Sequence, residues 1–223
     1  MKNSYLIAGV ILVVIILGVV LRGNKTEAPV AQPDGAENKV SGPLVDGSYN
    51  LQASSSVISW EGEYLTGLTE NGTVKLSSGE FVIQNGLITS GEFIIDMDTI
   101  ESIPHKDMLV THLKADDFFG VKTYPTAKFI FKKMIPSSEE GAKVGRYVIA
   151  GDLLVRGITQ PISFTTTLRS DRNELEATAS FAINRADWEV KYNSASSFKD
   201  FGDKIIRDAV TIGLDLKGVK VIQ

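Results

Sequence analysis

Apolar and polar residues alternate along most of this chain. In the stretch from Val57 to Thr66, for example, Ile58 and Trp60 fall on one face, and Ser59 and Glu61 fall on the other. A period of two is expected of a β-strand that buries one face. The alternating part of the chain shows no long stretch with the 3.6-residue period of a helix. The pattern therefore predicts an all-β domain.

The alternating stretches are separated by Gly, Asn, Asp and Pro residues, which favour turns. The clearest hairpin has Asn85-Gly86 at its turn, because this pair accepts the positive φ angles of a type I′ turn. Strands that are neighbours in sequence are expected to pair, and closing the sheet removes exposed edges. The prediction is an eight-stranded antiparallel up-and-down barrel. Eight long strands are expected at Val57–Thr66, Leu68–Leu76, Leu87–Met97, Ala127–Ile135, Arg146–Val155, Pro161–Arg169, Glu174–Asn184 and Ile205–Lys217, and the short stretch Phe81–Gln84 forms the first arm of the Asn85-Gly86 hairpin.

A long connection separates the strand ending near Met97 from the strand beginning near Ala127. The segment from His105 to Leu113 is predicted to form a short helix, and Phe118 and Phe119 follow it. Loops of this length in a compact domain usually have a function. Burying each phenylalanine would contribute roughly 1.5 to 3 kcal/mol, so the two rings are expected to plug or line one end of the barrel.

The N-terminal segment has a different pattern. An uncharged run from Tyr5 to Leu21 is flanked by Lys2 and Arg22. As a helix it would span about 26 Å at roughly 1.5 Å per residue, slightly less than a hydrocarbon core, and snorkelling basic side chains close such a gap. Residues 1–22 are therefore predicted to be one transmembrane helix.

The alternative for this segment is a signal peptide that is cleaved late, between Ala28 and Ala31. Under either interpretation the rest of the chain is exported. Residues 23–43, rich in Gly, Pro, Asn, Ala and Glu, are predicted to be a flexible linker. Residues 44–223 are predicted to be the barrel domain, held on the extracytoplasmic side of a membrane or secreted after cleavage.

Composition excludes some functions. The 223 residues carry a net charge of −4 and no local run of Lys and Arg, so nucleic acid is not an expected partner. The chain has no cysteine, which removes disulfides, thiolate metal ligands and thiol nucleophiles.

The segment from His112 to Phe129 resembles the signature of the YceI-like family of polyisoprenoid-binding proteins; it reads HLKADDFFGVKTYPTAKF. Other blocks also resemble the family, in the family's order, and together they extend from about Gly47 to Lys217. They are Ser59–Gly62 followed by Thr66-Gly67, Gly91–Met97, Gly151–Pro161 and Phe201–Asp208.

The resemblance implies a lipocalin-like barrel with an apolar interior that holds an isoprenoid lipid, such as an isoprenoid quinone or a prenyl pyrophosphate. Periodicity alone does not reveal a cavity, because an eight-stranded barrel is either filled by side chains or holds one small ligand. Apart from the bound lipid, no cofactor and no metal are expected. The expected partners are that lipid and the membrane, and a homodimer is left open.

The chain departs from the family's pattern in two regions. Asn71 stands where many members carry a histidine. Arg185 is followed by Ala186, Asp187 and Trp188, where members commonly carry threonine, an aromatic residue and glycine, and Asn193 replaces a later glycine. These departures bear on the identity of the ligand and on the role of the barrel rim.

Apolar residues expected to face the interior are the predicted lining of the lipid site, and ordinary core packing is the competing interpretation for each. A second, polar set is predicted to meet the ligand's head group at the rim, although such residues more often serve as solvated surface charges. The rim set is His112, Arg156, Arg185 and Lys204. The lining set is Trp60, Phe81, Phe93, Ile95, Phe118, Phe119, Phe129, Phe131, Tyr147, Ile149, Phe164, Phe181 and Trp188.

Two other classes of function compete with lipid binding. A hydrolase is the less favoured class, because the chain has neither a Gly-x-Ser-x-Gly nor a His-Glu-x-x-His pattern. His105 and His112 lie near Asp107 and Asp116, but metal sites usually gather three or four ligands, so structural roles are expected and no catalytic residue is predicted. The other class is a non-enzymatic surface or envelope interaction or stress protein with a filled barrel.

Overall fold

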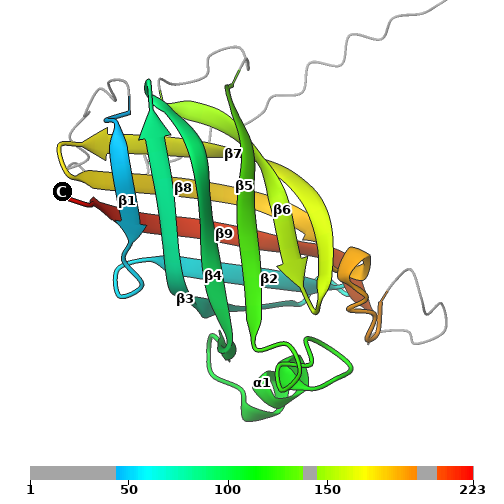
Figure 1. Cartoon of the computed structure of the whole chain (residues 1–223). Coiled ribbons are helices and arrows are strands. Elements are labelled where there is room, and N and C mark those ends of the chain that lie inside the picture. The colour runs from blue at the N-terminus through cyan, green and yellow to red at the C-terminus, as the bar shows by residue number, and fades with distance from the viewer. Residues whose placement is uncertain (1–43, 138–144, 195–204, 223) are drawn as a thin grey trace, which may run out of the picture. The chain divides into compact units, whose positions relative to one another are not determined.

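The computed structural model describes residues 44–137, 145–194 and 205–222. Within these ranges nine strands form one antiparallel sheet that is accompanied by a short α-helix and a 3₁₀ helix (Figure 1). The helices are α1 (Asp107–Lys114) and η1 (Arg185–Trp188). The strands are β1 (Gly47–Leu51), β2 (Val57–Tyr64), β3 (Thr69–Gln84), β4 (Leu87–Ser102), β5 (Thr126–Pro136), β6 (Arg146–Val155), β7 (Ile158–Asp171), β8 (Glu174–Asn184) and β9 (Ile206–Lys220).

The sheet closes into a barrel through β2. Trp60 of β2 lies opposite Gly72 of β3 on one side and opposite Ile212 of β9 on the other. Strand β1 pairs with other parts of the same two strands, since Asn50 lies opposite both Glu80 and Val219. Thus β1 and β2 share one position in the barrel, and the barrel has eight positions.

Every strand from β2 to β9 is antiparallel to the next one in sequence. The closed, eight-stranded up-and-down barrel that the sequence predicts is therefore confirmed. The turn at Asn85-Gly86 is also as predicted, with φ angles of 54° and 74°. The predicted short helix is present as α1.

One prediction about individual strands was wrong, and one strand was not predicted. The segments predicted as Leu68–Leu76 and Phe81–Gln84 belong to one 16-residue strand, β3. The polar residues between them resemble a turn in the sequence, but the strand continues past register shifts between Thr73 and Lys75 and between Leu76 and Ser78. Strand β1 was missed because it is only five residues long.

The N-terminal predictions fall outside the described ranges. They concern the transmembrane helix at residues 1–22 and the linker at residues 23–43. Within the part of the chain that the structure describes, neither helix has the length and apolar character needed to cross a bilayer.

Side chains fill the end of the barrel beside β1. Tyr49, Ile83 and Leu175 are each at most 2% exposed there. Leu51 lies close to the backbone of Gly79 in β3 and of Gly218 in β9, and the backbone N–H of Ile88 in β4 lies 3.4 Å from the sulfur of Met134 in β5. These contacts join neighbouring strands, and the buried side chains make this end a packed core, which we call the filled end.

Candidate functional site

The barrel is hollow at its other end, beside α1. A cavity with a volume of about 170 Å³ lies there. All eight strand positions contribute alternate residues to its wall, for example Phe93 and Ile95 of β4 and Leu153 and Val155 of β6. Most of the wall is aliphatic or aromatic, so the cavity is suited to an apolar ligand.

A row of four phenylalanine rings lines the wall at this end of the interior. The ring centroids of Phe93 and Phe129 are 5.1 Å apart, those of Phe129 and Phe164 are 5.8 Å apart, and those of Phe164 and Phe181 are 4.2 Å apart. These residues come from β4, β5, β7 and β8. Strand β6 contributes Gly151, where a Cβ would lie only 2.3 Å from Cζ of Phe129. The missing side chain of Gly151 therefore makes room for the row.

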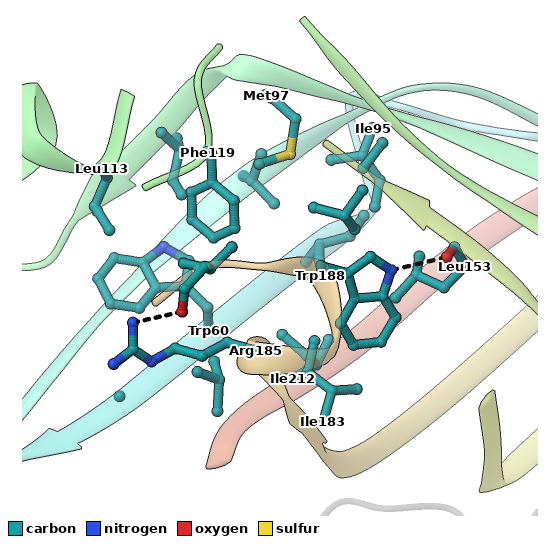
Figure 2. Close-up of a pocket in the computed structure, with 18 of the residues that line it drawn as sticks. Trp60, Ile95, Met97, Leu113, Phe119, Leu153, Ile183, Arg185, Trp188 and Ile212 are labelled. Atoms are coloured by element: carbon teal, nitrogen blue, oxygen red, sulfur yellow. Dashed lines mark hydrogen bonds between the residues drawn. The ribbon is translucent and has the colours of Figure 1, made fainter. Parts of the chain in front are cut away.

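The connection after β4 covers the cavity. Leu109 and Leu113 of α1 contribute to the wall, as do Phe118 and Phe119 from the turns that follow the helix. Those turns are held by backbone hydrogen bonds, among them 3.0 Å from Phe118 N to Ala115 O. In Figure 2, Leu113 and Phe119 lie on the same side of the pocket, near Met97.

Trp188 and Arg185 of η1 form another part of the wall. Trp188 is 2% exposed, and its indole N–H donates to the carbonyl of Leu153 over 3.0 Å. The Arg185 guanidinium donates to the carbonyl of Val190 over 2.9 Å. Figure 2 shows both hydrogen bonds.

Arg185 is a buried cation whose donors are occupied. Its guanidinium also donates to the carbonyls of Ile206 and Arg207, each over 3.3 Å, and lies 3.8 Å from a carboxylate oxygen of Asp208. Burial lowers the pKa of Arg185 from its usual value, and the Asp208 carboxylate opposes that shift. The guanidinium remains charged, because arginine does not lose its proton in proteins. Arg185 thus fastens η1 to β9.

The polar groups of the cavity wall include Tyr64 and Glu70. Both oxygens of the Glu70 carboxylate accept hydrogen bonds from the Lys106 ammonium, at 2.7 and 2.6 Å. Burial, and then the Glu70 charge, raises the pKa of the Tyr64 hydroxyl. Among the described residues, that hydroxyl has no hydrogen-bond partner. Almost all of the surface that faces the cavity is apolar, so the Tyr64 hydroxyl and the Glu70 carboxylate contribute little to the surface that a ligand would meet.

Nine of the thirteen residues predicted to line a lipid site lie in the cavity wall. The other four do not: Phe81, Phe131 and Ile149 are buried elsewhere in the core, and Tyr147 is half-buried. Alternation along a strand indicates which face a residue occupies but not its height along the barrel axis, so it does not show which inward residues lie at the level of the cavity. The nine are Trp60, Phe93, Ile95, Phe118, Phe119, Phe129, Phe164, Phe181 and Trp188.

The residues predicted to meet a head group are not gathered at one place. Arg185 lies in the wall, but Arg156 donates to the carbonyl of Phe118, and His112 stacks on Tyr192 with ring centroids 5.9 Å apart. Lys204 lies outside the described residues. Arg156 and His112 therefore hold the covering connection in place.

Sequence reasoning also missed many residues of the wall. Several lie two positions from a predicted lining residue on the same strand, and this spacing was the available signal. Gly62 and Met97 carried this signal too, two positions from Trp60 and from Ile95, whereas the charged Glu70 was not expected in an apolar wall. The missed residues include Ile58, Gly62, Tyr64, Glu70, Met97, Leu113, Ala127, Leu153, Val155, Ile162, Ile183, Val190, Val210, Ile212 and Leu214.

The two histidines serve different contacts. His105 forms hydrogen bonds of 2.6 Å with Glu101 and 2.8 Å with Asp107, whereas His112 packs on an aromatic ring. In the described ranges, the His, Asp and Glu side chains form no cluster of three or more that could hold a metal ion.

Comparison with known proteins agrees with this architecture. A UPF0312 protein of Pseudomonas putida strain GB-1 is 25% identical over 154 residues, which cover 66% of this chain and 77% of that protein. The crystal structure of BcnA from Burkholderia cenocepacia superposes with a TM-score of 0.61 at 19% identity, covering 75% of this chain and 98% of BcnA.

A second solved structure has the same fold. It is described as a polyisoprenoid binding domain from Saccharophagus degradans, and it superposes with a TM-score of 0.59 at 17% identity, covering 78% of this chain and 98% of that domain. The model of the YceI-like domain matches residues 49–218, which include all eight positions of the barrel. The chain therefore belongs to the YceI-like family.

Proposed function

We propose that the barrel binds an isoprenoid lipid and holds the isoprenoid chain in the apolar cavity. The observation that carries this proposal is the hollow end of the barrel, where a wall of aliphatic and aromatic side chains encloses open space. The description of the related domain from Saccharophagus degradans as polyisoprenoid-binding supports the same class of ligand. Burial of the chain would contribute roughly 25 cal/mol for each Å² of apolar surface, less the cost of ordering it.

The polar groups of the wall favour a neutral head group, such as a quinone, over a pyrophosphate. The Lys106 ammonium is already paired with Glu70, and the Arg185 guanidinium is already bound to backbone carbonyls. A pyrophosphate would therefore find no free cation among the described residues of the wall. The surface that faces the cavity is almost wholly apolar, which suits a head group without charge.

We further propose that the barrel works on the extracytoplasmic side of a membrane, tethered by residues 1–22. The uncharged run from Tyr5 to Leu21 motivates this proposal. Protease added to intact cells or spheroplasts should digest the barrel while the cytoplasmic proteins remain whole. A barrel that stays intact until the inner membrane is lysed would contradict the proposed location.

The hollow interior does not fit a surface-interaction protein with a filled barrel. No observation in the described residues favours a hydrolase, since the two histidines lie in separate contacts. Lipid carriage, or sensing of the lipid, is therefore the function that the geometry supports best.

Gly62 offers a direct test of lipid binding. It lies in the cavity wall, and a Cβ built on it would meet no atom within 4 Å. The Gly62→Leu substitution should therefore fill part of the cavity without a clash. We expect the full-length wild-type chain, purified from membranes, to carry an isoprenoid detectable by lipid extraction and mass spectrometry. The variant should carry about tenfold less, because loss of about two CH₂ contacts at ~0.8 kcal/mol each corresponds to roughly that factor.

Glu61→Leu is the matched control, since Glu61 lies on the same strand and is exposed on the outer face. It adds the same side chain outside the cavity and should leave the lipid content unchanged. Recovery of no isoprenoid from the wild type, or equal recovery from wild type and Gly62→Leu, would contradict the proposed site.

A further inference from the structure

Exposed apolar side chains gather around the covered end of the barrel. In the described residues, Met108 is 77% exposed, Leu68 61% and Ile103 56%. Among the large apolar residues described, only Ile222, at 82%, is more exposed than Met108. Leu65, in the same turn as Leu68, is 46% exposed. Single exposed apolar residues are common on protein surfaces, but a group of them indicates an interaction site.

The four side chains come from elements that touch one another. Leu65 and Leu68 lie in the β2–β3 turn, which is closed by a hydrogen bond of 2.8 Å from Tyr64 N to Leu68 O. Ile103 donates its backbone N–H to the carbonyl of Asn71 over 2.8 Å, beside that turn. We call Leu65, Leu68, Ile103 and Met108 the apolar rim.

An ion pair between Lys106 and Glu70 holds the start of α1, which carries Met108, against the beginning of β3. Lys106 lies two residues before Met108, Glu70 lies two residues after Leu68, and the Lys106 ammonium binds both oxygens of the Glu70 carboxylate. Glu70 also belongs to the cavity wall. The segments that carry the apolar rim are therefore joined to the cavity wall through Glu70, at the end where α1 lies (Figure 1).

The charged groups near the rim are paired with one another. Besides the pair between Lys106 and Glu70, Arg207 lies 3.2 Å from Glu63, and His105 is bound to two carboxylates. This arrangement offers no surplus of cations to attract anionic head groups. A partner that fits the rim therefore has an apolar interior beneath a polar surface. That surface need not be negatively charged.

We propose that the apolar rim inserts into the surface of a lipid bilayer, so that a lipid passes between the bilayer and the cavity without crossing water. This inference rests on the proposed lipid-binding function. The occupant is a bilayer and not a protein, because the ligand of the adjoining cavity resides in a bilayer. The N-terminal run from Tyr5 to Leu21, expected to enter a membrane, would supply that surface.

The linker is long enough for this arrangement. The described chain begins at Leu44, beside the filled end, where Val45 N donates to Ser170 Oγ over 2.7 Å. The 21 residues from 23 to 43 reach at most about 70 Å at ~3.3 Å per residue. Strand β3, with 16 residues, extends roughly 50 Å at ~3.3 Å per residue. The rim can therefore face the same membrane that holds the N-terminus.

The absence of cysteine allows a clean test with single labels. Leu68→Cys and Met108→Cys would each carry an environment-sensitive fluorophore, and Leu87→Cys would be the matched control. Leu87 is 40% exposed and follows the Asn85-Gly86 turn beside the filled end. The full-length variants would be reconstituted in phosphatidylcholine vesicles, with and without lipids that carry a quencher in their acyl chains.

We expect quenching of the labels at positions 68 and 108 to exceed quenching at position 87 by about threefold or more, and to persist in high salt because no charge attraction is involved. Equal quenching at the three positions would overturn the inference, and so would quenching that appears only with anionic lipid.

Lipid extraction from the same samples separates the two proposals. A lipid-loaded barrel without rim quenching contradicts docking alone, and an empty barrel with rim quenching contradicts lipid binding alone.

Discussion

Two inward-facing glycines of the barrel have opposite surroundings. A Cβ at Gly151 would lie 2.3 Å from Cζ of Phe129 and 2.5 Å from the backbone oxygen of Ile130. A Cβ at Gly62 would meet no atom within 4 Å. The same amino acid therefore fulfils two roles, since one glycine admits an aromatic ring and the other leaves open space in the cavity.

Gly151→Ala should therefore destabilise the barrel. The backbone of Ile130 cannot move without disturbing the β5–β6 pairing, so we expect a loss of about 1 to 3 kcal/mol in the free energy of unfolding. Urea denaturation of the lipid-free protein would measure it as a lower transition midpoint.

Gly62→Ala is the matched control for this substitution. It should cost nothing and should raise stability by up to about 1 kcal/mol, because glycine weakens a strand and alanine restricts the unfolded chain. Equal effects of the two substitutions would contradict the close contact between Gly151 and Phe129.

At the residue scale, sequence predicts faces better than positions along the barrel. Alternation correctly turns Phe129 and Phe131 toward the same interior. Phe129 belongs to the row of rings in the cavity wall, and Phe131 lies in the core away from it. The strand period carries no information about height along the axis, because height depends on how the strands are staggered. Alternation places Gly62 on the same face as Trp60, but it does not show that the missing side chain leaves open space.

At the scale of elements, the start of α1 depends on one histidine. Helix α1 has no side chain that caps its N-terminus. His105 lies just before it and bridges Glu101, at the end of β4, and Asp107, the first residue of α1. The hydrogen bond with Asp107, and then the one with Glu101, raises the pKa of His105 above 6.5.

This bridge predicts that α1 is held more firmly at lower pH. Because the folded-state pKa of His105 lies above the unfolded value, its contribution is complete below about pH 6.5 and is lost as pH rises through the folded-state pKa. After correction for the intrinsic rate, hydrogen exchange should show weaker protection of the α1 amides at about pH 9 than at about pH 6.

His105→Gln should remove this dependence and leave α1 equally protected at both pH values. The effect is expected to be small and local, because all three side chains are largely exposed to solvent. A variant that retains the wild-type dependence would show that another group holds the helix.

The other elements show which features a sequence conveys. The hairpin between β3 and β4 was predicted because Asn85-Gly86 imposes a local conformation. The continuity of β3 through Ser77 and Ser78 was not predicted, because it is fixed by pairing with β4. Likewise β1 has little pattern of its own, and Asn50 is placed by its two neighbours, Glu80 and Val219. Local conformation can be predicted from the sequence, whereas pairing between distant strands adds information that only the fold provides.

At the scale of the whole molecule, the two ends of the barrel have separate tasks. The filled end is packed with buried side chains, and we attribute stability mainly to it. The hollow end gives up part of that packing, and we attribute binding to it. Since one closed sheet joins both ends, the solid end can hold the strands in place around open space.

A matched pair of isoleucines tests this division. Ile83, in the filled end, is 1% exposed. Ile212 is half-buried and lies in the cavity wall. Replacing Ile83 with alanine in the lipid-free protein should cost about 2 to 5 kcal/mol, because it removes contacts and leaves a new void. Ile212→Ala should cost clearly less, since part of that side chain already faces open space.

Added lipid should separate the two variants further. A bound chain would pack on Ile212, so the cost of Ile212→Ala should rise in the presence of saturating isoprenoid, whereas the cost of Ile83→Ala should not change. Denaturation with and without lipid measures both differences, because a ligand at fixed concentration stabilises the folded state by an amount that grows with the logarithm of its affinity. If both costs respond equally to lipid, the ligand does not lie in the hollow end, and stability and binding are not divided between the two ends of the barrel.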